Sequence, residues 1–212
     1  VPEEKAILMG IKHLIIGGGA IDDALASELK DFPNQVWSTY GMTETLSHIA
    51  LRRLNGENAS DWYTPFDSVN IRLSEEGTLI IHAPNVCAEE LTTNDIAEIN
   101  EEGKFRILGR KDNTINSGGV KIQIEQVEAA LKAHLDIPFQ ITARKDAKFG
   151  EIVVLIYNKV KDEASVRQVC EEALPTYWVP KAYIAVDELP MTGTGKPDRA
   201  TARKIASLPV SS

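Results

Sequence analysis

The sequence has only two cysteines in 212 residues, Cys87 and Cys170, and neither belongs to a CxxC pair. A disulfide framework and a cysteine-based zinc site are therefore not expected, and the two thiols are predicted to be idle or buried in a reducing cytoplasm. The chain also lacks a run of about 18 apolar residues, the length that a membrane-spanning helix needs. Its longest apolar stretch, IVVLIY from Ile152, has the length of a buried strand.

The first ten residues, VPEEKAILMG, contain no basic segment followed by an apolar run and so do not read as a secretory signal. They also lack an initiator Met, which leads us to expect that the chain is cut from a longer one. A hydrophobic content of 43% is sufficient for one large domain, or for two domains of about 100 residues each with real cores.

Basic residues are scarce in the first half of the chain. Residues 1–109 hold 8 Lys and Arg against 18 Asp and Glu, whereas residues 110–212 hold 15 against 13. The overall net charge of −8 argues against general nucleic-acid binding but is compatible with a local pocket for a small anion. The change in composition near residue 110 indicates a domain boundary; chance variation among solvent-exposed faces is the alternative.

The first part of the chain has the pattern of a parallel βαβ piece. The stretch KHLIIGGG predicts a short buried strand that ends in glycines, and AIDDALASELKDF after it has helical spacing. The stretch QVWSTY, from Gln35, predicts the next strand, so the piece covers residues 12–40. Ligands of open α/β sheets bind beyond the carboxyl ends of the strands. The loops GGGA and YGMTE are therefore the candidate ligand-binding loops.

The rest of the chain predicts antiparallel strands and then a separate small domain. Two stretches, VNIRLSEEGTLIIHAP and IAEINEEGKFRILGR, each read as a β-hairpin, which favours an antiparallel sheet or small barrel over residues 65–109. Beyond residue 110, the hairpin NTINSGGVKI precedes helices near IEQVEAALKAHL and EASVRQVCEEAL and after Asp198. Strands at FQITAR, EIVVLIY and AYIAV alternate with these helices, as in a small α+β domain.

Two loops of the βαβ piece carry candidate ligand-binding residues. The GGGA turn at residues 17–20 lets the backbone pass close to a flat ligand, although a tight strand-to-helix turn is the alternative; it fits the dinucleotide pattern GxGxxG poorly because residue 22 is Asp. In YGMTE, Tyr40 offers a face for a base and Gly41 a close approach. Thr43 offers a hydroxyl for a phosphate oxygen, and Glu44 a carboxylate for Mg²⁺, with an ordinary polar loop as the alternative.

Three further stretches carry charged side chains suited to a nucleotide. TTND ends in Asp95, whose carboxylate can take both hydroxyls of a ribose, and Arg110 suits the same sugar or its phosphate. An Asx turn and a surface arginine are the alternatives. LPMTGTGKPDR presents Lys196 on a flexible loop suited to reaching into a site from outside. It is not a Walker loop, because Pro197 follows the lysine.

Taken in order, five motifs resemble the later signature motifs of the adenylate-forming acyl-CoA synthetase superfamily: STYGMTE, TTND, GRKDNTINSGGVKIQIEQVE, LPTYWVP and LPMTGTGKPDR. Together they cover essentially the whole chain. Within the superfamily, GMTETLSHIAL and INSGGVKI are most similar to the o-succinylbenzoate-CoA ligases of menaquinone biosynthesis. The resemblance implies a reaction of a small carboxylic acid with ATP and Mg²⁺ to give an acyl-adenylate and pyrophosphate, followed by displacement of AMP by the thiol of coenzyme A.

The resemblance also implies a role for each matching residue. The residues expected at the nucleotide are Gly18, Gly19 and Ala20 along the adenine, Tyr40 stacked on it beside Gly41, Thr43 at the α-phosphate, Glu44 at Mg²⁺, and Asp95 with Arg110 at the ribose. Lys196 is expected to bridge the acyl carboxylate and the α-phosphate. Gly118 and Gly119 are expected to line the pantetheine passage. Asp112 is the expected hinge between a large-domain part, residues 1–109, and a mobile C-terminal domain, residues 110–212.

The residues after the Mg²⁺ motif are expected to contribute to an acyl pocket. Ser47 and His48 are predicted on a helix or loop that faces this pocket, where His48 is a candidate partner for the second carboxylate of an aromatic dicarboxylic acid. A histidine satisfied by backbone groups is the alternative. Met42 and Leu46 are expected to pack in the core.

Two departures from the superfamily pattern qualify the expected function. Ser38 stands where the motif usually has Asn, a change that a supporting hydrogen bond can tolerate. The Ser/Thr/Gly-rich phosphate loop of the large domain is absent, so we expect residues 1–109 to be the last part of that domain and the isolated chain to be inactive. Another aryl- or fatty-acid-CoA ligase and a non-catalytic nucleotide-binding module remain alternatives.

Overall fold

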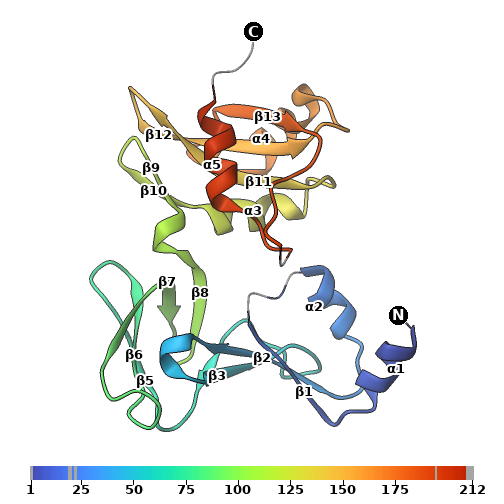
Figure 1. Cartoon of the computed structure of the whole chain (residues 1–212), viewed down its shortest axis with the longest axis vertical. Coiled ribbons are helices and arrows are strands. Elements are labelled where there is room, and N and C mark those ends of the chain that lie inside the picture. The colour runs from blue at the N-terminus through green and yellow to red at the C-terminus, as the bar shows by residue number, and fades with distance from the viewer. Residues whose placement is uncertain (1, 19–20, 22, 194, 209–212) are drawn as a thin grey trace. The chain divides into compact units, whose positions relative to one another are not determined.

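The computed structural model describes residues 2–18, 21, 23–193 and 195–208, and the chain divides into two compact units, residues 1–107 and 108–212 (Figure 1). The first unit holds two four-stranded sheets, with strand orders β1-β2-β3-β4 and β5-β6-β7-β8. Its helices and turns are α1 (Pro2–Met9), α2 (Asp23–Leu29) and the 3₁₀ turn η1 (Thr43–Thr45). Its strands are β1 (His13–Ile16), β2 (Gln35–Gly41), β3 (His48–Arg53), β4 (Thr64–Pro65), β5 (Asn70–Leu73), β6 (Thr78–His82), β7 (Leu91–Ile99) and β8 (Phe105–Arg110), the last of which continues into the second unit.

The predicted βαβ piece is confirmed, because β1 pairs with β2 in parallel with Leu14 opposite Val36. Leu29 and Phe32 pack with Val36 in a small core on this pair. The helix α2 ends at Leu29, earlier than predicted. Pro33 explains this, since a proline disfavours helical backbone at the residue before it.

A buried asparagine, which no sequence pattern had indicated, secures the entry into β2. Asn55 is 1% exposed, and its side-chain amide donates to the carbonyls of Phe32 and Asn34, both at 2.9 Å. Its Oδ1 accepts a hydrogen bond from the Val36 N–H at 3.1 Å. Since each polar atom of a buried amide needs a partner, this satisfied side chain fixes the turn before β2 and therefore the direction in which β2 delivers the YGMTE loop.

Both predicted hairpins of residues 65–109 are present as a four-stranded sheet. β5 pairs with β6 in antiparallel fashion, β6 with β7, and β7 is the neighbour of β8. Leu79, Ile81 and Phe105 from this sheet pack with Ile49 of β3 in one core cluster. This core holds the two sheets of the first unit together. The loop after β2 and the strand β7 are therefore supported by the same core.

The second unit is a five-stranded sheet between helices, as Figure 1 shows. Its strands run in the order β10-β9-β12-β11, and β13 pairs in parallel with β12. The elements are the 3₁₀ turn η2 (Lys111–Asn113), β9 (Thr114–Ser117), β10 (Val120–Gln123), α3 (Ile124–Lys132), β11 (Phe139–Asp146), β12 (Gly150–Asn158), α4 (Glu163–Ala173), β13 (Ala182–Val186) and α5 (Arg199–Ser207).

The continuous apolar run of β12 follows from burial on both faces. Val153 and Leu155 belong to the core that α3 and α4 cover, whereas Ile152 and Val154 pack with Ala206 of α5. Because successive side chains of a strand point to opposite faces, a strand covered on both sides needs apolar residues at every position. The length-based prediction of a buried strand at IVVLIY is therefore confirmed.

The structure bears on the two cysteines and on the possibility of a membrane-spanning helix. Cys87 and Cys170 are free thiols, and burial raises the pKa of the Cys170 thiol to about 11. Among the described residues, no helix combines the length and the apolar character needed to cross a membrane.

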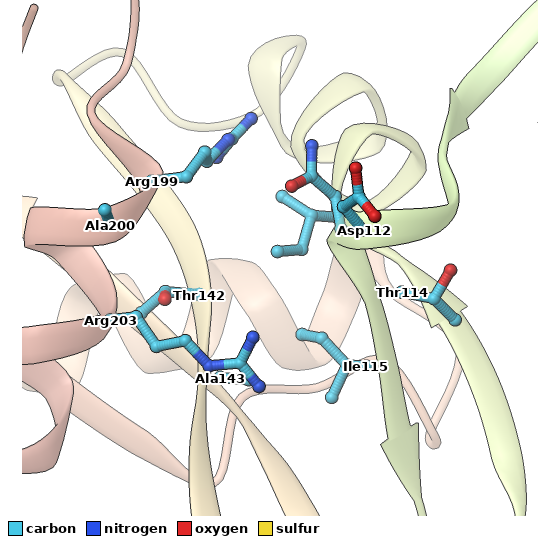
Figure 2. Close-up of a pocket in the computed structure, with 10 residues that line it drawn as sticks. Asp112, Thr114, Ile115, Thr142, Ala143, Arg199, Ala200 and Arg203 are labelled. Atoms are coloured by element: carbon cyan, nitrogen blue, oxygen red, sulfur yellow. The ribbon is translucent and has the colours of Figure 1, made fainter. Parts of the chain in front are cut away.

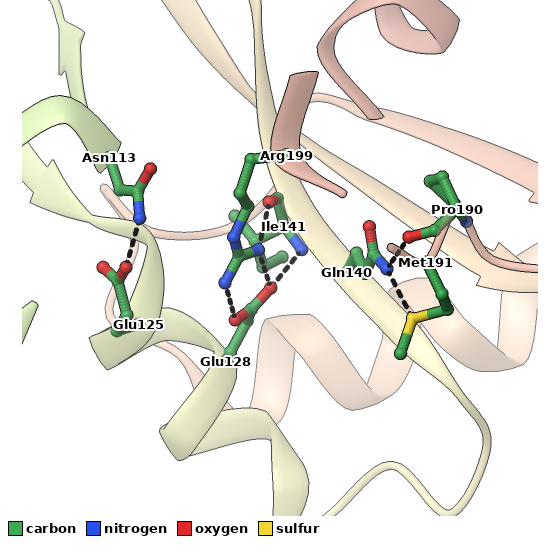
Figure 3. Close-up of polar contacts among 8 residues, drawn as sticks. All are labelled: Asn113, Glu125, Glu128, Gln140, Ile141, Pro190, Met191 and Arg199. Atoms are coloured by element: carbon green, nitrogen blue, oxygen red, sulfur yellow. Dashed lines mark hydrogen bonds and ion pairs between the residues drawn. The ribbon is translucent and has the colours of Figure 1, made fainter. Parts of the chain in front are cut away.

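A two-point ion pair fixes the start of α5 against the sheet and α3 (Figure 3). The Arg199 guanidinium donates to both carboxylate oxygens of Glu128, at 2.5 and 2.6 Å, and Glu128 also accepts the Ile141 N–H at 2.8 Å. Burial alone lowers the pKa of Arg199, but the hydrogen bond and the charge of Glu128 outweigh it and raise this pKa. The side chains are only 26% and 16% exposed, so this pair is far less screened by water than a surface pair.

We predict that Arg199→Ala destabilises the second unit by about 2–3 kcal/mol, because it leaves the Glu128 carboxylate poorly solvated and without its cation. Lys159→Ala, which breaks the exposed pair with Asp187, serves as the control and is expected to cost less than about 1 kcal/mol. Urea denaturation, followed through hydrogen exchange of the β11 and β12 amides, measures both. Equal losses of unfolding free energy in the two variants would show that the Glu128–Arg199 pair stabilises the unit no more than an exposed ion pair does.

Candidate functional site

Two predicted nucleotide-binding residues of the first unit meet directly. The Tyr40 hydroxyl, at the end of β2, donates to Oδ2 of Asp95 on β7 at 2.6 Å. Both side chains are half-buried. This short hydrogen bond to a carboxylate acceptor orients the Asp95 side chain. A ring and an adjacent carboxylate are the groups suited to the base and the ribose of a nucleoside.

A β-bulge directs Asp95 toward Tyr40. Ile80 pairs with Thr92 and Thr78 with Ile96, so residues 93–95 of β7 lie opposite the single residue 79 of β6. The Asp95 N–H bonds to Oγ1 of Thr93 at 3.1 Å inside this bulge. Bulges turn a side chain away from the regular alternation of a strand. Asp95 therefore lies within a bulged strand rather than in a loop between strands.

The Tyr40 ring rests on an aromatic cluster. Its edge meets Phe105 with centroids 5.1 Å apart at 80°, and Tyr63 lies 5.9 Å away. Ser38, which replaces the usual Asn, is fully buried, and its hydroxyl lies 2.9 Å from the Tyr63 hydroxyl. A supporting hydrogen bond of this kind was expected for Ser38, and it holds the cluster on which Tyr40 packs.

The predicted phosphate and Mg²⁺ ligands lie on the short turn η1 directly after β2. Thr43 and Glu44 are exposed, while Thr45 is fully buried. The Thr45 hydroxyl lies within 3.1 Å of the Met42 N–H and within 2.6 Å of the Ser47 carbonyl. Thr45 was not singled out from the sequence, yet it fixes the turn that presents its two neighbours to solvent.

Residues Met42 and Leu46 flank this turn in different ways. Met42 packs against the core of the first unit, as predicted. Leu46 is 83% exposed, so the prediction that it packs in the core is wrong. The cause is its left-handed backbone, with φ at 56°, which ends the 3₁₀ turn and directs the side chain outward. Such a conformation is uncommon for a non-glycine residue and is typical of functional loops.

Gly41 is required by the backbone that surrounds it. Tyr40 pairs with Ala50 and Gly41 with His48, so a register shift falls between them. A Cβ at Gly41 would lie 2.6 Å from the Ser47 carbonyl oxygen and 2.7 Å from the His48 Cα. Glycine is therefore needed here for close approach of two backbone segments, whatever it also offers to a ligand.

The glycine turn after β1 combines one crowded and one open position. A Cβ at Gly17 would lie 2.5 Å from Oγ1 of Thr39, whereas one at Gly18 would meet nothing within 4 Å. Gly18 has φ at 91°, a conformation that glycine adopts readily. Among the described residues, no atom crowds this position. The other predicted adenine contacts, Gly19 and Ala20, lie outside the described residues.

The candidate acyl-pocket residues begin a strand. Ser47 precedes β3 and His48 opens it, so the prediction of a helix or loop is wrong for His48. The strand forms because pairing with β2 and β4 on either side outweighs the weak local signal of HIALRR. His48 is exposed, with its ring 5.6 Å from that of Phe66. Its side chain is therefore accessible to a ligand.

In the second unit, Gly118 and Gly119 form the two-residue loop of the β9–β10 hairpin. Val120 pairs with Ser117 across it, and both glycines have positive φ, at 59° and 87°. This is the backbone that a tight type I′ hairpin turn requires. The Gly118 N–H donates to the Phe149 carbonyl at 2.8 Å, which anchors the loop to the start of β12.

Lys196 lies near the end of a small hairpin that precedes α5. Met191 and Pro197 form an isolated antiparallel bridge, and the Thr192 N–H donates to the Lys196 carbonyl at 2.7 Å. The Lys196 N–H in turn bonds to Oγ1 of Thr192 at 3.1 Å. Lys196 is exposed. The loop is thus held by hydrogen bonds, and Lys196 is an exposed residue on it.

Arg110 and the predicted hinge residue lie side by side at the start of the second unit. Arg110 Nη2 and Asp112 Oδ2 are 3.2 Å apart, and both side chains are more than half exposed, so this contact contributes little to stability. Asp112 also borders a pocket of about 180 Å³, whose other walls include Thr142 and the Arg199 and Arg203 side chains of α5 (Figure 2). Both arginines are engaged by glutamates, Glu128 and Glu151.

The expected metal, Mg²⁺, would need few protein ligands if a bound nucleotide supplied its phosphates. In the part of the chain that the structure describes, no group of three or more His, Cys, Asp or Glu side chains is placed to hold a metal ion. Mg²⁺ commonly binds through one or two carboxylates together with substrate phosphates, a requirement that the exposed Glu44 can meet. The Asp95 carboxylate, fixed by Tyr40, has the hydrogen-bonding capacity that a ribose needs.

Comparison with known proteins supports the resemblance found in the motifs. Residues 126–196 match the family model described as AMP-binding enzyme C-terminal domain. The chain is 24% identical to the 2-succinylbenzoate–CoA ligase of Listeria innocua serovar 6a, over 89% of this chain and 45% of that protein. The chain therefore spans about half the length of the curated relatives that it matches.

Solved structures give the same result. A crystal structure of an acyl-CoA synthetase (AMP-forming)/AMP-acid ligase II-like protein from Dyadobacter fermentans is 33% identical, with a TM-score of 0.50, over 89% of this chain and 56% of that one. The o-succinylbenzoate CoA synthetase of Bacillus subtilis, in complex with an acyl-adenylate intermediate, is 24% identical with a TM-score of 0.73, over 91% of this chain and 46% of that one. The expected fold class is thereby confirmed.

We predict that Gly41→Ala destabilises the first unit by about 1–3 kcal/mol, because its Cβ would collide with backbone that cannot swing aside. Glu44→Ala, on the exposed face of the adjacent turn, is the control and is expected to change stability by less than about 0.5 kcal/mol. Urea denaturation followed by hydrogen exchange of the β2 and β3 amides measures both. Unchanged stability in Gly41→Ala would mean that the glycine serves a ligand alone.

Proposed function

We propose that this member of the adenylate-forming acyl-CoA synthetase superfamily is the C-terminal part of an ATP-dependent carboxylate–CoA ligase. The complete ligase would convert a carboxylic acid and ATP to an acyl-adenylate and pyrophosphate, and then transfer the acyl group to coenzyme A with release of AMP. Its acid is o-succinylbenzoate, an intermediate of menaquinone biosynthesis, in keeping with the names of the curated relatives. Another aryl or fatty acid is the second candidate. The ligase is expected in the cytoplasm.

The observation that carries the proposal is the contact between Tyr40 and Asp95. These residues come from separate motifs 55 positions apart, and they meet through a 2.6 Å hydrogen bond. The motif match alone did not require this contact. A non-catalytic nucleotide-binding module would have the same contact, but it would have no need for the exposed Lys196 or for Glu44.

The chemistry of the first half-reaction is the meeting of two anions. The acid attacks as a carboxylate, so no general base is needed. In the proposed site, the Lys196 ammonium lies between the attacking carboxylate and the α-phosphate and offsets their repulsion. Glu44 would hold Mg²⁺, which would supply positive charge to neutralise the phosphates. One preorganised charged donor of this kind typically contributes about 3–4 kcal/mol to transition-state stabilisation.

The binding residues supply orientation. Asp95 holds the ribose and Tyr40 the base, while Thr43 contacts the α-phosphate from the η1 turn. Correct alignment of two reactants contributes up to about 7–11 kcal/mol in favourable cases. For this reason the fixed positions of β2 and β7 matter as much as the charge on Lys196.

The second half-reaction uses another face of the same small domain. We propose that rotation about Asp112 withdraws Lys196 and brings the Gly118–Gly119 loop to the site, where the bare backbone of the two glycines borders the pantetheine arm. The Lys196 loop and the Gly118–Gly119 loop cannot occupy the same opening at once. The two half-reactions therefore use different orientations of the small domain. Arg110, next to the hinge, contacts the nucleotide sugar or phosphate.

The acyl group is proposed to lie toward β3. His48 is exposed beside Phe66, an arrangement that offers an aromatic surface and a polar group to an aromatic dicarboxylic acid. Ser47 is the adjacent hydroxyl. A fatty acid would make no use of a polar group at this position, which favours the dicarboxylate.

We predict that Lys196→Ala in the full-length ligase lowers the rate of adenylation by at least about 100-fold and leaves thioester formation from supplied acyl-adenylate within about threefold. Pyrophosphate exchange measures the first half-reaction and thioester release the second. Lys159→Ala, an exposed lysine paired with Asp187, is the control and should alter neither. Equal losses in both half-reactions would contradict the division of labour between the two faces.

A further inference from the structure

A glutamine with no assigned role is buried beneath the lysine loop. Gln140 lies on β11 and is 2% exposed. The alternation of β11 places it on the same face as Thr142, which lines the pocket beside α5, and opposite to Ile141 and Ala143, which pack in the α3–α4 core. An uncharged polar side chain at such a depth is uncommon and needs partners.

The partners of Gln140 are the two residues from which the loop starts (Figure 3). Its Nε2 donates to the Pro190 carbonyl at 2.8 Å and lies 3.5 Å from the Met191 sulfur. The same Pro190 carbonyl accepts the Asp198 N–H at 2.9 Å from the other end of the loop. One carbonyl is thus held by two donors, one from the sheet and one from the cap of α5.

The far end of the loop is fixed independently. Asp198 caps α5 by accepting the Thr201 N–H at 3.0 Å, and Arg199, the first residue of the helix, is clamped by Glu128. The bridge between Met191 and Pro197 joins the two ends of the loop. Gln140 is therefore the contact by which the sheet itself holds the starting strand of the loop.

We propose that Gln140 is a positioning residue for Lys196, an assignment that rests on the proposed function of the lysine. By fixing Pro190 and Met191 against β11, Gln140 sets the direction in which the hairpin carries the ammonium. It does not touch substrate and does not serve the half-reaction in which the Gly118–Gly119 loop is used.

The hydrogen bonding of Gln140 separates this role from simple stabilisation. Its Oε1 is buried and has no hydrogen-bond partner among the described residues, which disfavours the folded state. Replacement by methionine removes that unsatisfied oxygen and conserves the shape of the side chain. The Pro190 carbonyl keeps the Asp198 donor, so the fold loses no required hydrogen bond. If Gln140 only stabilised the fold, its replacement would instead lower the melting temperature.

The first test uses residues 1–212 and needs no catalysis. We expect Gln140→Met, and Gln140→Leu as a second variant, to leave the melting temperature unchanged or higher. The ¹⁵N relaxation of the Gly193, Gly195 and Lys196 amides should show greater mobility in both variants. Gln168→Met is the control, because Gln168 is exposed on α4, where its side chain donates to Glu172. A lower melting temperature with unchanged loop relaxation in both variants would overturn the proposal.

The second test uses the full-length ligase. Gln140→Met is expected to lower the maximal rate of adenylation about tenfold, with the KM for ATP within about twofold and thioester formation from supplied acyl-adenylate unchanged. Unchanged adenylation alongside an inactive Lys196→Ala ligase would refute the role of Gln140 and leave the proposed function standing. If Lys196→Ala itself adenylates normally, the proposed function fails, while the relaxation experiment still decides whether Gln140 orders the loop.

Discussion

The hydrogen bond from Tyr40 to Asp95 is the constraint on which the first unit's site depends. It joins the carboxyl end of β2, in the parallel βαβ sheet, to a bulge in β7, in the antiparallel sheet. The distance of 2.6 Å requires both elements to be placed accurately, and each has its own support. Buried Asn55 fixes the entry into β2, and the Ser38–Tyr63 pair supports the aromatic cluster under Tyr40. The proposed nucleoside site therefore lies where the carboxyl end of β2 meets the bulge of β7.

In the second unit, the proposed catalytic group, Lys196, lies on a loop rather than on a strand. Lys196 is exposed, yet the residues on either side of its hairpin are tied to the buried sheet. Gln140 holds the start, and the Glu128–Arg199 pair holds the helix that follows. Such an arrangement suits a group that must enter a site and leave it again as a unit. In the proposed mechanism, the Lys196 charge would move together with its domain, because these contacts all lie inside the second unit.

Local patterns predicted most of the fold. The alternation in the two hairpins, the apolar run of β12 and the cap before α5 gave these elements nearly their observed bounds. β3 was missed because its strand state depends on pairing on both sides. Leu46 was misplaced because a left-handed backbone leaves no signal in a non-glycine residue. The contacts of Tyr40 and Gln140 join residues that are far apart in the chain, which no spacing in the sequence reveals.

The most direct test of the account is the affinity of the full-length ligase for AMP, measured by isothermal titration calorimetry with Tyr40→Phe, Asp95→Asn and the double variant. Loss of the hydroxyl that orients Asp95 is expected to weaken AMP binding about 5- to 30-fold, equivalent to about 1–2 kcal/mol. The double variant should bind little worse than Asp95→Asn alone, since the hydroxyl acts through the carboxylate. Unchanged affinity in both single variants would contradict the assignment of this pair to the nucleoside.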